Sequence, residues 1–287
     1  MSSPVALLPI TEDDLPATCN LMAKTLADGQ KSAERWLDAF TQSWSSDKPN
    51  NGYMLRTDGG EIVGALGCIH GLRPVAGKTL SVCNLTSWTV LPEYRGYSMR
   101  LLSAALKQNI DVFTNFTPLP STVAIFKRFK FEAVDCTARV GINLPGFASG
   151  VVTDPALLLQ LLSPDALQHY RAHESAPGVY SIGIKVDGTV RLVVVTRSKL
   201  KGLSCATVVY CEDRQVLRDR LTALSAFLLF KLGMVFLRIE ERFGASPPVT
   251  VKTMSGIYLY LDRTGTMSER ELDGLYSELT FLIPTVP

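Results

Sequence analysis

The segment VLPEYRGYSMRLL, residues 90–102, decides how the chain is interpreted. An apolar, β-branched run, Leu80–Val90, precedes it, and apolar residues recur at helical spacing from Met99 to Ile110 after it. The pattern predicts a strand, a tight loop and a helix. The first turn of such a helix presents free backbone N–H groups at the positive end of the helix dipole, which favours a phosphate group. Gly96 would allow close backbone approach, and Arg95 and Arg100 add cationic donors.

The loop PEYRGYS, residues 92–98, resembles the acyl-CoA-binding loop of the GNAT acetyltransferase superfamily, whose usual pattern is Q/R-x-x-G-x-G/A. Glu93 stands where Gln or Arg is usual, Gly96 matches the first glycine, and Ser98 takes the Gly/Ala position. An ordinary turn that opens a helix is the alternative interpretation of the same residues.

The predicted order of elements in the first half also resembles this superfamily. A helix is predicted from Thr11, then a hairpin over residues 53–72, the strand Leu80–Val90, the helix after the loop, a strand over 111–117, a helix over 121–129 and a hairpin over 131–144. The resemblance therefore implies an α/β fold with a mixed sheet, in a GNAT-like acyl-CoA-binding domain over residues 1–145.

The second half, residues 151–287, repeats this pattern after the linker PGFASG. The run Leu203–Asp213 has the character of Leu80–Glu93, and a helix over 214–227 and a strand over 234–239 follow it. This order predicts a degenerate second GNAT-like domain, with an unrelated α+β domain as the alternative. Its loop at 212–215 has no glycine and two acids, so we expect no phosphate site there.

The resemblance implies that acetyl-CoA, or another acyl-CoA, is the co-substrate. In the superfamily two central strands diverge and their main chain binds the pantetheine arm as an added strand would. The cofactor-binding residues implied here are Trp88, Thr89, Val90, Arg95, Gly96, Tyr97, Ser98, Met99, Arg100, Asn115 and Phe126.

Acyl transfer to an amine also needs a base and a proton donor for the leaving thiolate. Residues 84–89 carry no carboxylate, and Phe126 stands where the superfamily often has a tyrosine. The candidate catalytic residues are therefore His70, Cys83 and Tyr97. A solvated surface histidine and a buried, inert cysteine are the alternatives for the first two. Trp36, on the predicted helix 32–44, lies either along the acceptor cleft or in the core.

Composition narrows the class of protein. The net charge of +2 over 287 residues gives no strong field, so we expect no nucleic-acid partner. The six cysteines form no CxxC pair and only three histidines accompany them, so no metal site is predicted. The lack of a basic and apolar leader predicts a cytoplasmic protein with reduced thiols. The apolar stretch 221–239 is predicted to be a buried helix plus strand, not a membrane span, and no oligomeric state is predicted.

The sequence thus predicts an acyltransferase that moves an acetyl group from acetyl-CoA to an amine of an unidentified acceptor. A non-catalytic tandem protein that binds CoA or acts as a scaffold is the first alternative, because the usual base and acid are missing. A transferase of longer acyl chains or of aminoacyl groups from tRNA is the second.

Overall fold

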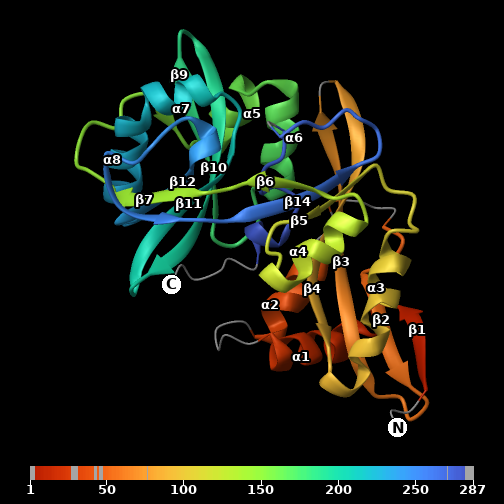
Figure 1. Cartoon of the computed structure of the whole chain (residues 1–287). Coiled ribbons are helices and arrows are strands. Elements are labelled where there is room, and N and C mark those ends of the chain that lie inside the picture. Colours follow the sequence, from red (N-terminus) through yellow and green to blue (C-terminus); the bar gives the residue numbers. More distant parts are fainter. Residues whose placement is uncertain are drawn as a thin grey trace. The chain divides into compact units, whose positions relative to one another are not determined.

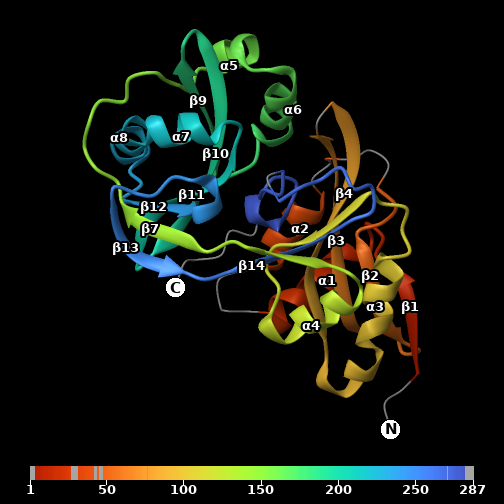
Figure 2. The same cartoon turned by 45° about the horizontal axis from the view of Figure 1, so that its top comes forward.

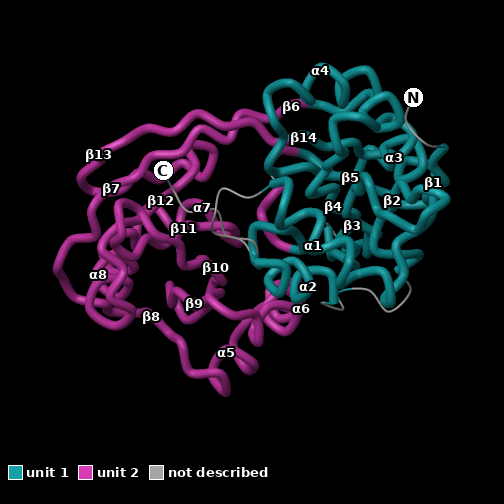
Figure 3. The backbone as a smooth tube through the Cα atoms, turned by 90° about the horizontal axis from the view of Figure 1, so that it is seen from below, with its two compact units in different colours: residues 1–132, 259–268, 276–282 teal, residues 133–258, 269–275, 283–287 magenta. Residues whose placement is uncertain are grey.

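The computed structural model describes residues 4–26, 32–41, 44, 48–75, 77–269 and 271–281. The chain divides into two compact units (Figure 3). Unit 1 comprises residues 1–132, 259–268 and 276–282, and unit 2 comprises residues 133–258, 269–275 and 283–287.

Within the described residues, the sheet of unit 1 has the strand order β1-β2-β3-β4-β5-β14-β6 (Figure 1). Neighbours from β1 to β4 are antiparallel, β4 and β5 are parallel, and β14 is antiparallel to β5. The strands are β1 (Val5–Pro9), β2 (Gly52–Thr57), β3 (Ile62–Val75), β4 (Lys78–Val90), β5 (Val112–Asn115), β6 (Glu132–Asp135) and β14 (Ile257–Asp262).

Helices cover both faces of this sheet (Figure 3). The helices α3 (Ser98–Ala105) and α4 (Pro120–Arg128) pack on one face, where Leu101, Leu102 and Phe126 are fully buried against β3, β4 and β5. The helices α1 (Leu15–Thr25) and α2 (Ala33–Thr41) lie on the other. Alternate strand residues therefore face apolar neighbours on both sides, which explains the near-continuous apolar runs of β3 and β4.

The sheet of unit 2 has the order β13-β7-β12-β11-β10-β9-β8 among the described residues. The helices α7 (Arg214–Asp219) and α8 (Leu221–Leu232) follow each other along one face (Figure 2), and α5 (Pro155–Leu161) and α6 (Pro164–His173) pack against β9 and β10. The strands are β7 (Ala138–Ile142), β8 (Val151–Val152), β9 (Val179–Val186), β10 (Thr189–Leu200), β11 (Leu203–Cys211), β12 (Phe236–Glu240) and β13 (Val249–Met254).

The two sheets share one strand pattern. From β8 to β11 the neighbours are antiparallel, β11 and β12 are parallel, and β7 is antiparallel to β12, which reproduces β1 to β5 followed by β14. The predicted mixed α/β architecture with two sheets is confirmed.

The compact units differ from the predicted division into 1–145 and 151–287. The strand β7 belongs to the sheet of the second half although it precedes the linker, and β14 joins the sheet of the first half although it comes near the chain's end. Each sheet thus takes a strand that the sequence pattern had assigned to the other.

The apolar stretch at 221–239 forms a helix followed by a strand, as predicted. The helix α8 ends at Gly233, which has a φ of 63°, and the chain continues into β12. In the part of the chain that the structure describes, every helix is too short or too polar to span a bilayer.

Candidate functional site

The strands β4 and β5 diverge soon after they meet. They pair only from Val82–Val112 to Asn84–Thr114; β5 then ends at Asn115, whereas β4 continues to Val90. Among the described residues, no strand pairs with the edge of β4 beyond Asn84 in place of β5. Unpaired main-chain groups at such a gap can bind an extended ligand as a strand would.

A β-bulge sits on β4 at this gap. Gly67 of β3 lies opposite Thr86 and Ala65 lies opposite Thr89, so that Ser87 and Trp88 together face one residue. Ser87 has φ of 60°, a left-handed conformation that a non-glycine residue rarely adopts. Bulges redirect the strand and are frequent next to active sites.

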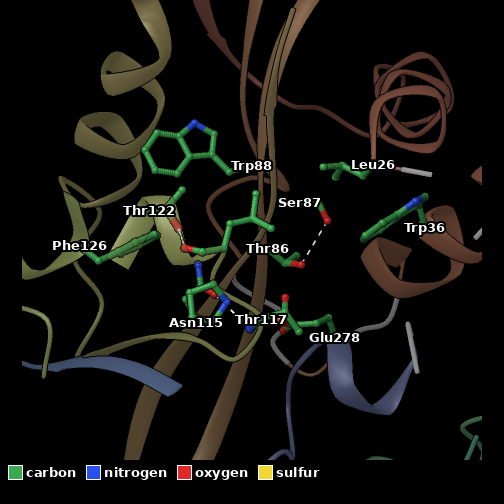
Figure 4. Close-up of a pocket in the computed structure, with 12 residues that line it drawn as sticks. Leu26, Trp36, Thr86, Ser87, Trp88, Asn115, Thr117, Thr122, Phe126 and Glu278 are labelled. Carbon is green, nitrogen blue, oxygen red and sulfur yellow. Dashed lines mark hydrogen bonds between the residues drawn. The ribbon is translucent and has the colours of Figure 1, made fainter. Parts of the chain in front are cut away.

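A pocket opens where the two strands separate (Figure 4). Its walls come from seven parts of unit 1: β4, β5, the loop after β5, the helix α4, the end of α1, the helix α2 and the C-terminal region. The lining residues are Leu26, Trp36, Thr86, Ser87, Trp88, Asn115, Thr117, Pro118, Leu119, Thr122, Phe126 and Glu278.

Aromatic rings form one wall of the pocket. The Phe126 ring is fully buried and packs edge-on against Trp88, with ring centroids 5.8 Å apart, and against Phe131 at 4.9 Å. Phe126 therefore holds the wall apolar and has no proton to donate. Trp36 is buried, as its interpretation as a core residue expects, and it is also part of the lining.

Glu278 is the acidic residue of this lining, and it is 2% exposed. The hydroxyl of Thr117 donates to its carboxylate at 2.9 Å, and its own backbone N–H donates to the Asn84 side chain at 3.2 Å. Asn84 in turn donates to the Thr114 hydroxyl at 3.2 Å. A chain of polar groups along β4 and β5 thus fixes a carboxylate at the pocket.

Aromatic packing anchors the segment that carries Glu278. The Trp44 ring contacts the rings of Tyr276 and Phe281, at centroid distances of 5.6 and 5.1 Å. Gly71 leaves room for Tyr276, because a Cβ there would lie 2.9 Å from its ring. Sequence analysis missed Glu278; the one signal was a single acid within the apolar run 275–281.

Solved structures of proteins described as acyltransferases share this arrangement of elements. A GCN5-related N-acetyltransferase from Anabaena variabilis matches with a TM-score of 0.56 at 10% identity, over 90% of this chain and 72% of that one. A putative acetyltransferase from Pyrococcus horikoshii matches with a TM-score of 0.55 at 16% identity, over 96% and 94%. The N-myristoyltransferase of Saccharomyces cerevisiae, solved with bound myristoyl-CoA, matches with a TM-score of 0.55 at 11% identity, over 94% and 88%.

The chain has the fold of the GCN5-related N-acetyltransferases. The sequence itself matches no family profile and no curated protein. Each structural match extends over both units, since each covers at least 90% of the chain.

The predicted phosphate loop of this GCN5-related fold forms a 3-10 helix, Pro92–Tyr97, that runs directly into α3. The N–H of Tyr94 donates to Leu91 and that of Ser98 donates to Arg95, so these two groups are used within the turn. Arg95 and Gly96 are exposed, and a Cβ added at Gly96 would meet no atom within 4 Å.

The other predicted cofactor residues divide between the pocket and its surroundings. Trp88, Asn115 and Phe126 line the pocket. Thr89 instead donates from its hydroxyl to Thr25, and Val90 packs into the core. On α3, Met99 is exposed, and Arg100 reaches the Val5 carbonyl and stacks over Tyr97.

The three predicted catalytic residues do not line the pocket. Tyr97 is half-buried at the start of α3. The interpretation of His70 as a surface histidine before a turn is wrong: β3 continues to Val75, so that His70 lies mid-strand opposite Cys83 and is 5% exposed. Cys83 is fully buried. The Cys83 thiol has the largest effect on Cys68 and lowers its pKa; the His70 ring lowers it further, whereas burial opposes both. Burial raises the pKa of Cys83 itself.

The corresponding gap in unit 2 is filled by the chain itself. The strands β11 and β12 pair only from Cys205 to Thr207, and beyond this the N–H of Gly274 donates to the carbonyl of Val209 at 2.9 Å. Leu272 and Leu275 of the same segment are buried. Residues 271–275 therefore lie at the edge of β11 that corresponds to the open edge of β4.

Proposed function

We propose that this protein is an acyl-CoA-dependent N-acyltransferase that binds its acyl donor in the pocket between β4 and β5. The observation that carries the proposal is the open edge of β4 beside this pocket. The edge offers main-chain groups from Leu85 onward to a pantetheine arm, and the bulge at Ser87 redirects them.

The group transferred is an acetyl group from acetyl-CoA, and the acceptor is an amine. The amine nitrogen would attack the thioester carbonyl, and the carbon–sulfur bond would break to release CoA. Glu278 is the base in this proposal, because its carboxylate lies in the pocket and would take the proton that the attacking ammonium must lose. Burial within hydrogen-bonded neighbours keeps the carboxylate positioned for this step.

One acyl donor would bind per chain. We propose that the second half is a degenerate GNAT-like domain because of its strand pattern. Residues 271–275 close its own gap. We also propose a cytoplasmic location, for which the six free cysteines are the support.

A non-catalytic, CoA-binding protein is the second candidate. It is favoured by Phe126, which stands where the superfamily often has a tyrosine, and by the phosphate loop, in which the N–H groups of Tyr94 and Ser98 donate within the turn. Thiolate departure without a tyrosine would then depend on protonation by water.

The test is calorimetry of acetyl-CoA against the wild type and Gly96→Glu. The exposed position of Gly96 accepts a side chain without contacting any neighbour, so the fold should be unchanged while a negative charge enters the proposed phosphate site. We expect micromolar binding by the wild type, and binding at least tenfold weaker in Gly96→Glu than in Gly96→Ala, which adds a Cβ without the negative charge.

A screen of amine acceptors, measured by release of free CoA thiol, then separates the candidates. Turnover supports the transferase, whereas binding without turnover for any amine supports the non-catalytic protein. Failure of the wild type to bind acetyl-CoA or longer acyl-CoA donors would overturn the proposal.

A further inference from the structure

A cluster of three metal-binding side chains lies in the core of unit 1, apart from the pocket. It consists of Cys68, His70 and Cys83, all buried, and one ligand atom from each lies within 4.8 Å of the other two. Cys68 and His70 are two residues apart on β3 and so share a face, and Cys83 of β4 lies directly opposite His70. No sequence motif indicates the cluster, because its members meet across two strands and not at a local CxxC spacing.

The His70 ring is unusual for a core histidine. Neither of its nitrogens has a partner with ordinary hydrogen-bond geometry among the described residues, although both are inaccessible to solvent, and the ring interacts with the Cys68 thiol. An unsatisfied buried polar group costs about 1 to 3 kcal/mol, and nearly all such groups in proteins have a partner. A metal ion that accepts the lone pair of one ring nitrogen would satisfy that nitrogen, and the two neighbouring sulfur atoms limit the kind of ion that fits.

We propose that Cys68, His70 and Cys83 form a site for one Cu(I) ion. Thiolate and imidazole ligands are those that a soft metal ion prefers. Bond lengths of about 2.3 Å to sulfur and about 2.0 Å to nitrogen place the donors of a three-coordinate ion about 3.8 to 4.0 Å apart, which the cluster can provide. The same ion would pin β3 to β4 just before β4 leaves β5.

The number of donors favours Cu(I) over Zn²⁺. Protein zinc is almost always four-coordinate, and among the described residues no fourth His, Cys, Asp or Glu joins the cluster. Water is a poor fourth ligand here, because Leu101, Leu102 and Phe113 belong to the same buried apolar core as both cysteines. A monovalent ion with three donors needs no further ligand.

The test is an anaerobic titration of the full chain with Cu(I), with bicinchoninate as the competing chelator. We expect the wild type to hold one Cu(I) per chain and Cys68→Ala and Cys83→Ala to lose it. His70→Phe, which keeps a ring of similar size, should bind at least tenfold more weakly. The control is Cys205→Ala, which removes an equally buried thiol from unit 2 and should leave binding unchanged.

A second measurement needs only the wild type. X-ray absorption at the copper edge should show two sulfur donors and one nitrogen donor, and Cu(I) should raise the melting temperature of the wild type. Equal Cu(I) binding by Cys68→Ala, a spectrum without nitrogen, or preferential retention of Zn²⁺ would each overturn the proposal. Acyl-CoA binding by the same samples reports separately on the proposed function, since none of the three residues lines the pocket.

Discussion

The ion pair between Arg242 and Glu240 is buried, and replacing the arginine should destabilise unit 2 strongly. Their side chains are 11% and 5% exposed. Arg242 also donates to the carbonyls of Glu269 and Leu272, which anchors the segment that fills the gap beside β11. In Arg242→Met the cation is lost, and Glu240 stays buried with Tyr258 as its hydrogen-bond donor. Removing one partner of a buried ion pair costs about 3 to 5 kcal/mol.

The neighbouring pair of Arg139 and Glu241 supplies a matched control. Its Nε–Oε1 distance is 2.7 Å, but both side chains are nearly half exposed, so Arg139→Met should cost about 0 to 1 kcal/mol. The three tryptophans all lie in unit 1, whereas circular dichroism reports both units. Urea unfolding followed by both signals should show Arg242→Met losing the dichroism of unit 2 at lower urea than the fluorescence of unit 1.

Hydrogen exchange gives the local result: the Gly274 amide, bonded to Val209, should lose protection in Arg242→Met and keep it in Arg139→Met. The reasoning would be refuted if Arg242→Met lowered the free energy of unfolding by less than about 1 kcal/mol, or if the two variants lowered it equally. Either outcome would mean that hydrophobic packing of Leu272 and Leu275 alone holds this segment.

Three further perturbations test other parts of the structure. Glu278→Gln should lower kcat/KM by about 100- to 10,000-fold with acyl-CoA affinity unchanged, because a general base contributes that much; retention of a third of the activity would contradict the role. Hydrogen bonds from the backbone of Thr264 and Met267 outweigh burial and lower the pKa of Asp262 below 3.8, so its contribution to stability is present above that pH and is lost as the pH falls through the lowered value. Urea unfolding of Asp262→Asn should therefore show a lower stability than the wild type at pH 7, and the difference should shrink toward pH 3. A difference that stays constant with pH would mean that the lowered pKa of Asp262 is not its cause. Ser87→Val should lower the stability by about 1 to 3 kcal/mol and weaken acyl-CoA binding, whereas Ser87→Gly should do neither, since only glycine accepts a φ of 60° without strain. Thermal melts measure the stability of the two variants, and calorimetry measures their acyl-CoA binding.

The fold could be predicted because its determinants are local. The apolar face of α3, the turn residues of the hairpins and the glycine that ends α8 each act within a few residues, and they gave the order of elements. The exchange of β7 and β14 between the sheets could not be predicted, because these short strands pair with segments far away in the sequence, and no local pattern records which sheet they join.

The site could be predicted only where main-chain geometry defines it. The divergence of β4 from β5 followed from the resemblance, and it brought Trp88, Asn115 and Phe126 to the pocket. His70 was misplaced because the length of β3, not its composition, determines whether the ring is buried. Glu278 could not be found because its approach to Thr117 spans 161 residues of sequence, and no local pattern records such a contact.

The two gaps differ because of one stretch of chain near the C-terminus. Its first part, 271–275, donates a main-chain hydrogen bond to β11 and closes the gap in unit 2. Its continuation, 276–281, packs on Trp44 of unit 1 and carries Glu278 to the pocket that is still open. A chain with two copies of one strand pattern would otherwise offer two equivalent edges to an acyl donor. Filling one edge while supplying a carboxylate to the other makes the halves chemically different, so that acyl transfer is expected at β4 alone.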